Sequence, residues 1–165
     1  MTFFRRLAGA LMAAALALPL PAAAGTLAIG FGDSMFSHKG APSSATLDLE
    51  WQAAPLWQPG QWRISPFVAL SFDRHNDAWG GIGLTAQRDF GRWFVEISEV
   101  PGLYHNGGAA TDLGGPLEFR TLFGLGYHVT DTTSVMLAAY HRSNANLYAP
   151  NPGVNTVSLR FLQRF

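Results

Sequence analysis

The 165-residue sequence contains no cysteine, so disulfide bonds cannot stabilise the fold. Charged residues are also scarce, at 13% of the chain against a usual value of ~25%. Acidic and basic residues balance at 11 each, which argues against a nucleic-acid partner because such partners select basic surfaces. After residue 24 no segment has ~18 uninterrupted apolar residues, which argues against a helical membrane protein. Aromatic residues, by contrast, reach 13%.

Residues 1–24 have the three parts of a secretory signal peptide. Arg5 and Arg6 supply the positive start, Leu7–Leu20 is the apolar stretch, and Ala22–Ala24 is a small-residue cleavage site. We therefore expect residues 1–24 to be a signal peptide and residues 25–165 to form a single domain. The domain must be stabilised by backbone pairing and burial alone.

The remaining sequence alternates apolar and polar residues with a period of two, which predicts strands. Eight segments carry this pattern: 27–32, 46–52, 62–73, 79–86, 93–98, 118–129, 135–143 and 156–161. No convincing helical periodicity lies between them. We expect longer links at 34–43, 101–116 and 144–152. These would all lie at one end if the strands form an antiparallel barrel with both ends of the mature chain in the periplasm.

Two barrels fit eight alternating strands. In a soluble lipid carrier the apolar face points inward, whereas in an outer-membrane barrel it points to lipid and the polar face fills the lumen. Large aromatic residues near the predicted strand ends favour the second, because they resemble an interfacial girdle: Trp51, Trp62, Trp79, Trp93 and Tyr127. We predict an all-β fold, an eight-stranded antiparallel transmembrane β-barrel in the cell outer membrane. Side chains fill the interior of so small a barrel, which argues against a transport pore.

His141 and Ser143 lie two residues apart in the seventh segment, so their side chains share one face of the strand. That face also carries Val135 and Leu137, which are predicted to contact lipid. Asn155 shares the lipid-facing parity of the last strand. Three polar residues thus interrupt two neighbouring apolar stripes beside one outer link. A His next to a Ser is the minimum for an activated oxygen nucleophile, so these residues are candidate catalytic groups.

The stretch 141–155 resembles the motif of the lipid A 3-O-deacylase (PagL) family. That resemblance implies an eight-stranded outer-membrane barrel with a Ser-His-Glu triad on its outer wall, acting on lipid A in lipopolysaccharide. The reaction it implies is hydrolysis of the ester-linked 3-hydroxyacyl chain at position 3. His141 matches the catalytic His and Ser143 the nucleophile. Asn144, Asn151 and Gly153 match the adjoining loop residues, and Asn151 is the candidate oxyanion-hole side chain. Neither a cofactor nor a metal is implied.

One position departs from the family pattern, because Asn155 stands where the family has its acidic residue. An amide oxygen can accept the imidazole Nδ1–H but brings no negative charge, and the comparable change in serine proteases costs ~10⁴ in turnover. Three interpretations stay open: the family tolerates Asn, the enzyme is slow, or the protein is a catalytically inactive structural or adhesive barrel. The sequence also leaves open whether two copies associate as a homodimer.

Overall fold

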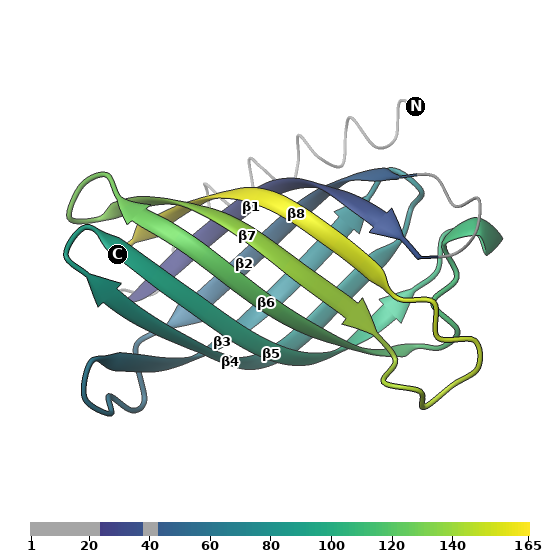
Figure 1. The fold of residues 1–165 in the computed structure, drawn as a ribbon, viewed down its shortest axis with the longest axis horizontal. Coiled ribbons are helices and arrows are strands. Elements are labelled where there is room, and N and C mark those ends of the chain that lie inside the picture. The colour runs from purple at the N-terminus through teal and green to yellow at the C-terminus, as the bar shows by residue number, and fades with distance from the viewer. Residues whose placement is uncertain (1–23, 38–42) are drawn as a thin grey trace.

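The computed structural model describes residues 24–37 and 43–165. Most of the expected signal peptide (1–23) and the centre of the first link (38–42) therefore lie outside the described residues. The rest forms a closed antiparallel barrel in which each strand pairs with its neighbours in sequence and β8 pairs with β1 (Figure 1). The strands are β1 Gly25–Phe36, β2 Ser44–Ala53, β3 Trp62–Asp73, β4 Ala78–Phe90, β5 Trp93–His105, β6 Leu117–His128, β7 Thr133–Ser143 and β8 Val154–Arg164.

The all-β, eight-stranded antiparallel fold predicted from the sequence is thus confirmed. A short 3₁₀ helix, Ala109–Thr111, lies in the link between β5 and β6. Within the described part of the chain no helix is long and apolar enough to cross a membrane. The start of β1 and the C-terminus lie at one end of the barrel, where the Phe165 N–H donates to the Gly25 carbonyl (2.9 Å). We call this the terminal end, and the opposite end, where β7 passes into β8, the loop end.

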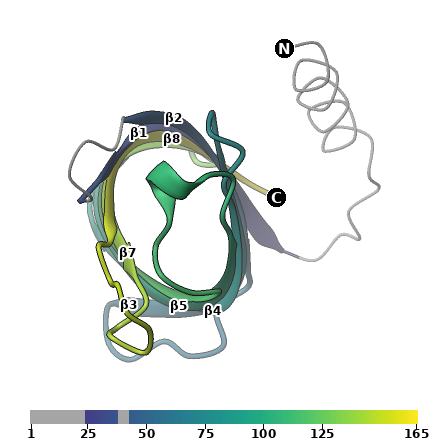
Figure 2. The same cartoon turned by 90° about the vertical axis from the view of Figure 1, so that its right-hand side faces the viewer.

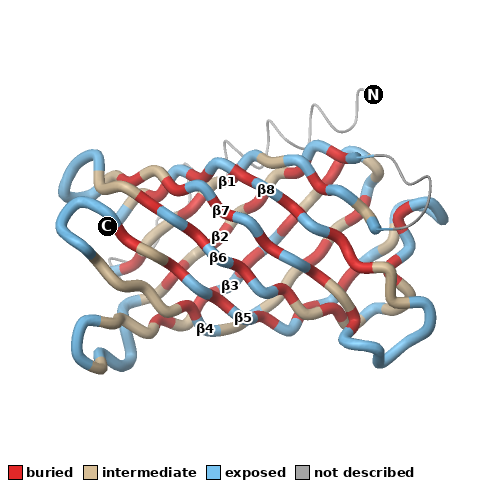
Figure 3. Tube along the Cα trace, in the orientation of Figure 1, coloured by how far each residue is buried: buried red, intermediate tan, exposed pale blue. Residues whose placement is uncertain are grey.

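Exposed and buried residues alternate along the strands (Figure 3). The outward face is apolar and solvent-accessible in the isolated chain, as a lipid-facing wall requires. It carries Phe31, Val68, Leu70, Ile82, Leu84, Ile97, Phe123, Leu125, Leu137, Val157, Leu159 and Phe161. The inward face carries most of the buried charges: Asp48, Glu50, Glu96, Glu118, Arg120, Arg142 and Arg160. The predicted orientation, apolar side outward, is confirmed.

An ion-pair network crosses the lumen and ties distant strands together. One carboxylate oxygen of Glu50 on β2 accepts hydrogen bonds from Arg120 on β6 (2.8 Å) and from Arg160 on β8 (3.0 Å). The Tyr140 hydroxyl on β7 donates to Asp48 on β2 (3.0 Å). Buried charges are costly unless they are paired. For Glu50, Arg120 and Arg160, opposite charges from non-adjacent strands supply that pairing.

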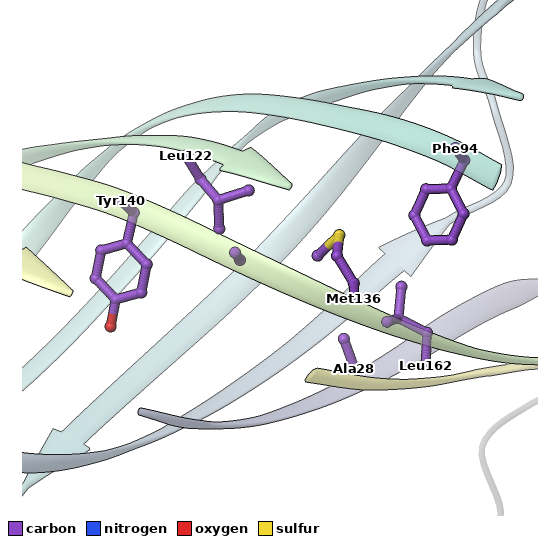
Figure 4. Packing of buried hydrophobic residues seen from close by; sticks show 7 residues of the cluster. Ala28, Phe94, Leu122, Met136, Tyr140 and Leu162 are labelled. Atoms are coloured by element: carbon purple, nitrogen blue, oxygen red, sulfur yellow. The ribbon is translucent and has the colours of Figure 1, made fainter. Parts of the chain in front are cut away.

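Apolar side chains fill part of the lumen beside this network (Figure 4). They form a cluster of Ala28, Phe94, Leu122, Met136, Ala138, Tyr140 and Leu162. Two glycines on β6 make room for two of these side chains. A Cβ at Gly124 would lie 2.4 Å from the Met136 sulfur, and one at Gly126 would lie 2.0 Å from the Phe94 ring. Packing of these side chains therefore fills part of the narrow lumen.

The prediction that Trp79 belongs to an interfacial girdle is wrong. Its side chain is only 1% exposed and lies inside the barrel, where the indole N–H donates to the Glu118 carbonyl (3.3 Å). Gly81 and Gly102 provide the space, because a Cβ at either position would lie within 3 Å of the indole ring. The Arg120 guanidinium lies 5.1 Å from the ring centre. Cation–π contact and glycine neighbours thus account for an inward tryptophan.

The link predicted to begin at residue 101 begins later, because β5 continues to His105. Pro101 lacks an N–H group, and the pairing of β4 with β5 skips the two residues between Gly81↔Gly102 and Leu84↔Glu99. Pairing with β6 continues through Pro101↔Phe119. The proline therefore interrupts one ladder locally without ending the strand.

Candidate active site

His141 and Asn155 lie opposite each other on β7 and β8, as their parity predicted. They are register partners, both exposed on the outward face. The Nδ1–H of His141 donates to the amide oxygen of Asn155 over 2.9 Å. This hydrogen bond holds the imidazole in the tautomer whose Nε2 carries a free lone pair. An imidazole in that state can accept a proton.

Ser143 is the last residue of β7 and lies on the same face as His141. Its side chain is half-buried and its register partner is Phe119 on β6. Among the described residues, its hydroxyl has no side-chain hydrogen bond, and none joins it to His141. The candidate nucleophile and base therefore share a face, with no hydrogen bond between them. Catalytic hydrogen bonds often become short and well aligned only when substrate is bound.

Gly153 lies against the imidazole just before β8 begins. Its φ is +67°, a left-handed conformation that favours glycine. A Cβ at this position would lie 2.8 Å from Cε1 and 3.3 Å from Nε2 of His141. The Gly153 carbonyl accepts a hydrogen bond from the Ser37 N–H over 3.1 Å, which ties this turn to the end of β1. Both backbone conformation and space at His141 therefore require glycine here.

Asn144 and Asn151 hold the link between β7 and β8 in shape. The buried amide of Asn144 donates to the carbonyls of Leu113 (2.9 Å) and Pro150 (3.1 Å). Asn151 accepts from the Asn144 backbone N–H (3.0 Å) and donates to Asn146 (3.1 Å). The Asn144 amide nitrogen thus has both hydrogens engaged, whereas Asn151 keeps one amide hydrogen for a further acceptor.

The β5–β6 link supports this loop from the lumen side. Viewed from the loop end, it lies across the mouth of the barrel, while the β7–β8 link lies at the rim (Figure 2). Leu113, which belongs to the β5–β6 link, is fully buried. Gly114, with φ of +91°, and Gly115 lie directly against Pro150 and Tyr148. Two glycines thus allow the two links to pack closely, and this packing fixes the backbone next to Ser143.

Two further polar residues lie on the same wall and were not predicted. Thr121 on β6 is the register partner of His141 on the side away from Asn155, and Glu99 on β5 is the register partner of Thr121. Both are exposed on the outward face. Parity could have revealed them, since Glu99 has the parity of Val95 and Ile97. No group of three His, Asp or Glu residues gathers as a metal site in the described ranges.

The fold and the site together define a class: a small transmembrane β-barrel with a Ser/His pair on its lipid-facing wall. A family model described as lipid A 3-O-deacylase (PagL) matches residues 40–163. The chain belongs to the lipid A 3-O-deacylase (PagL) family, whose members are outer-membrane β-barrels, and its location is the outer membrane.

Solved structures agree with the fold. The crystal structure of the outer membrane enzyme PagL is 20% identical with a TM-score of 0.63, covering 85% of this chain and 99% of that chain. A de novo designed transmembrane β-barrel is 8% identical with a TM-score of 0.60, over 87% and 96% of the two chains. Neisserial surface protein A is 12% identical with a TM-score of 0.53, over 86% and 96%. No curated protein matches the chain.

Proposed function

We propose that this protein is a lipid A deacylase that hydrolyses the ester-linked 3-hydroxyacyl chain at position 3 of lipid A by a Ser/His mechanism. The observation that carries the proposal is the 2.9 Å hydrogen bond from His141 Nδ1–H to Asn155 on the outward wall. It leaves Nε2 free as a base on the face that Ser143 shares. A lipid ester in the same membrane leaflet can approach that face laterally, without entering the lumen.

In the first half-reaction His141 Nε2 takes the hydroxyl proton of Ser143 while Oγ attacks the ester carbonyl carbon. The free amide hydrogen of Asn151 and nearby backbone N–H groups stabilise the tetrahedral oxyanion. The intermediate collapses to an acyl-serine, and the imidazolium returns its proton to the departing sugar oxygen. A water molecule, deprotonated by His141, then attacks the acyl-serine. This step releases the fatty acid and restores the Ser143 hydroxyl.

The test is fatty-acid release from purified lipopolysaccharide by the detergent-solubilised protein. Removal of the nucleophile in Ser143→Ala is expected to lower kcat by about 10³-fold or more. Ser134→Ala is the matched control, because it removes a hydroxyl from the far end of the same strand, where Ser134 contacts His128. Full activity of Ser143→Ala would exclude this nucleophile. Mass spectrometry of the lipid product identifies the chain that is removed.

A second candidate function is a catalytically inactive structural or adhesive barrel. Two observations favour it: Asn155 provides no negative charge, and no hydrogen bond joins Ser143 to His141. This candidate predicts an unchanged lipid A mass after expression of the protein in a host with an outer membrane. Loss of one hydroxyacyl group, dependent on Ser143, would instead exclude it.

A further inference from the structure

Four polar residues form a continuous row on the lipid-facing wall. Glu99 pairs with Thr121, Thr121 pairs with His141, and His141 pairs with Asn155. All four are exposed on the outward face. His141 and Asn155 belong to the candidate active site, but the mechanism uses neither Glu99 nor Thr121. The row therefore extends the polar surface two strands beyond the candidate catalytic residues.

The row descends from the loop end toward the middle of the wall. Counted from the loop end, Asn155 is the second residue of β8 and His141 the third of β7. Thr121 is the fifth residue of β6, and Glu99 is the seventh of thirteen in β5. Glu99 is thus the central residue of a spanning strand. Its outward neighbours include Ile97 on β5 and Leu84 opposite on β4.

A carboxylate at this depth on the lipid side is unfavourable unless it has a partner. Its one side-chain partner among the described residues is Thr121, whose hydroxyl donates to Glu99 Oε2 over 2.5 Å. That bond uses the only hydroxyl hydrogen of Thr121. The pair is left with acceptor capacity alone, on the threonine oxygen and both carboxylate oxygens. It therefore requires a hydrogen-bond donor from outside the chain, and the surrounding medium is lipid.

We propose that Glu99 and Thr121 form a specificity subsite that accepts a hydrogen bond from a hydroxyl or amide N–H on the acyl side of the lipid. This inference rests on the proposed function, because the same lipid presents its ester to Ser143 and His141. Adjacent strands are about 5 Å apart, so the subsite begins about 5 Å from the imidazole and ends about 10 Å away. Because the row descends, the recognised donor lies on the acyl chains and below the headgroup.

The test compares synthetic glycolipid esters that differ in one group: a plain acyl ester, an ester with a hydroxyl on its acyl chain, and an ester beside an amide-linked chain. Competition in mixed micelles gives the ratio of kcat/KM values directly. The unmodified protein is expected to prefer a donor-bearing ester over the plain one by about tenfold, the worth of one net hydrogen bond. Which of the two donor-bearing esters is preferred shows whether the donor is a hydroxyl or an amide N–H.

Thr121→Val and Glu99→Leu are expected to bring this ratio close to one, while Glu99→Gln retains part of it through its amide oxygen. The control variants Ile97→Leu and Phe123→Leu alter the next outward register pair toward the terminal end and should keep the full ratio. Because the carboxylate is unfavourable in lipid, Glu99→Leu should not lower the denaturant midpoint of unfolding. A lowered midpoint together with an equal fall of kcat/KM on every ester would assign the pair a structural role and overturn the proposal.

Binding measurements separate this inference from the proposed function. Titration calorimetry of the same lipids in micelles with the Ser143→Ala protein is expected to give about tenfold tighter binding of the donor-bearing lipid. That difference should vanish in Ser143→Ala/Thr121→Val. If the unmodified protein hydrolyses no ester but keeps this binding preference, the proposed function fails and the subsite stands. Equal binding of all three lipids overturns the subsite, whatever the activity.

Discussion

Single residues on either side of His141 determine how its imidazole is held. Asn155 accepts the Nδ1–H on one side, and Gly153 leaves room at Cε1 and Nε2 on the other. The first contact selects the tautomer and the second sets the position of the ring. Neither contact requires charge, so the arrangement is compatible with an amide in the position of the family's acidic residue. It still lacks the electrostatic stabilisation of an imidazolium that a carboxylate provides.

Substitution of Asn155 separates orientation from charge. Asn155→Glu should preserve or raise kcat, because a carboxylate accepts the same hydrogen bond and stabilises the imidazolium. Asn155→Leu should lower kcat by about 10²-fold or more with little change in KM, since it removes the acceptor that holds the tautomer. Steady-state kinetics on purified lipopolysaccharide provide both values. Equal kcat for Asn155→Leu and the unmodified protein would show that this hydrogen bond has no catalytic role.

Gly153→Ala should disturb the imidazole directly. The new methyl group would lie 2.8 Å from Cε1 of His141, so the ring must shift from its position, and kcat should fall by about 10²-fold. Gly91→Ala is a close control. Gly91 has the same φ of +67°, but a Cβ there meets nothing within 4 Å. Both variants should lose about 1 kcal/mol of unfolding free energy through backbone strain. Comparable activity of the two variants would contradict this account.

At the scale of the strand, period-two alternation was enough to predict all eight elements and the face of most of their side chains. The placement of His141 beside Asn155 followed from their shared parity on two neighbouring strands. The errors arose where a tertiary contact overrides a local pattern. Trp79 lies inward because Gly81 on its own strand and Gly102 on β5 leave space for the indole ring. Pro101 stays within β5 because it still pairs with β6. The hydrogen bond from the Asn144 amide to the Leu113 carbonyl forms only because two links far apart in the sequence meet, which no local pattern reveals.

Pairing across the lumen predicts how strongly non-adjacent strands depend on one another. Glu50→Gln removes the charge that both Arg120 and Arg160 contact, and leaves two buried guanidiniums undercompensated. The unfolding free energy should fall by about 3–5 kcal/mol. Arg63→Gln serves as the control, because the Arg63–Asp89 pair is one-third exposed and should contribute less than about 1 kcal/mol. Urea titration of the folded barrel, followed by its heat-modifiable migration on gels, measures both. Equal losses would show that the lumen charges are not coupled.

For the whole molecule, access to the site depends on the outward direction of the apolar stripes, because a lipid ester can reach His141 and Ser143 laterally only if this wall faces lipid. If the wall faces lipid, the cost of a charge there must depend on its depth. Leu159 is the central residue of β8, whereas Gln163 has the same parity near the terminal end. Leu159→Arg should lower the unfolding free energy in lipid vesicles by about 2–4 kcal/mol, and Gln163→Arg by about 0–1 kcal/mol. Urea titration in vesicles measures this difference.

In detergent micelles, which adapt around a charge more readily, the difference should shrink. Equal costs at both positions would mean that the wall does not face a bilayer, and His141 and Ser143 would then have no lateral route to a lipid ester.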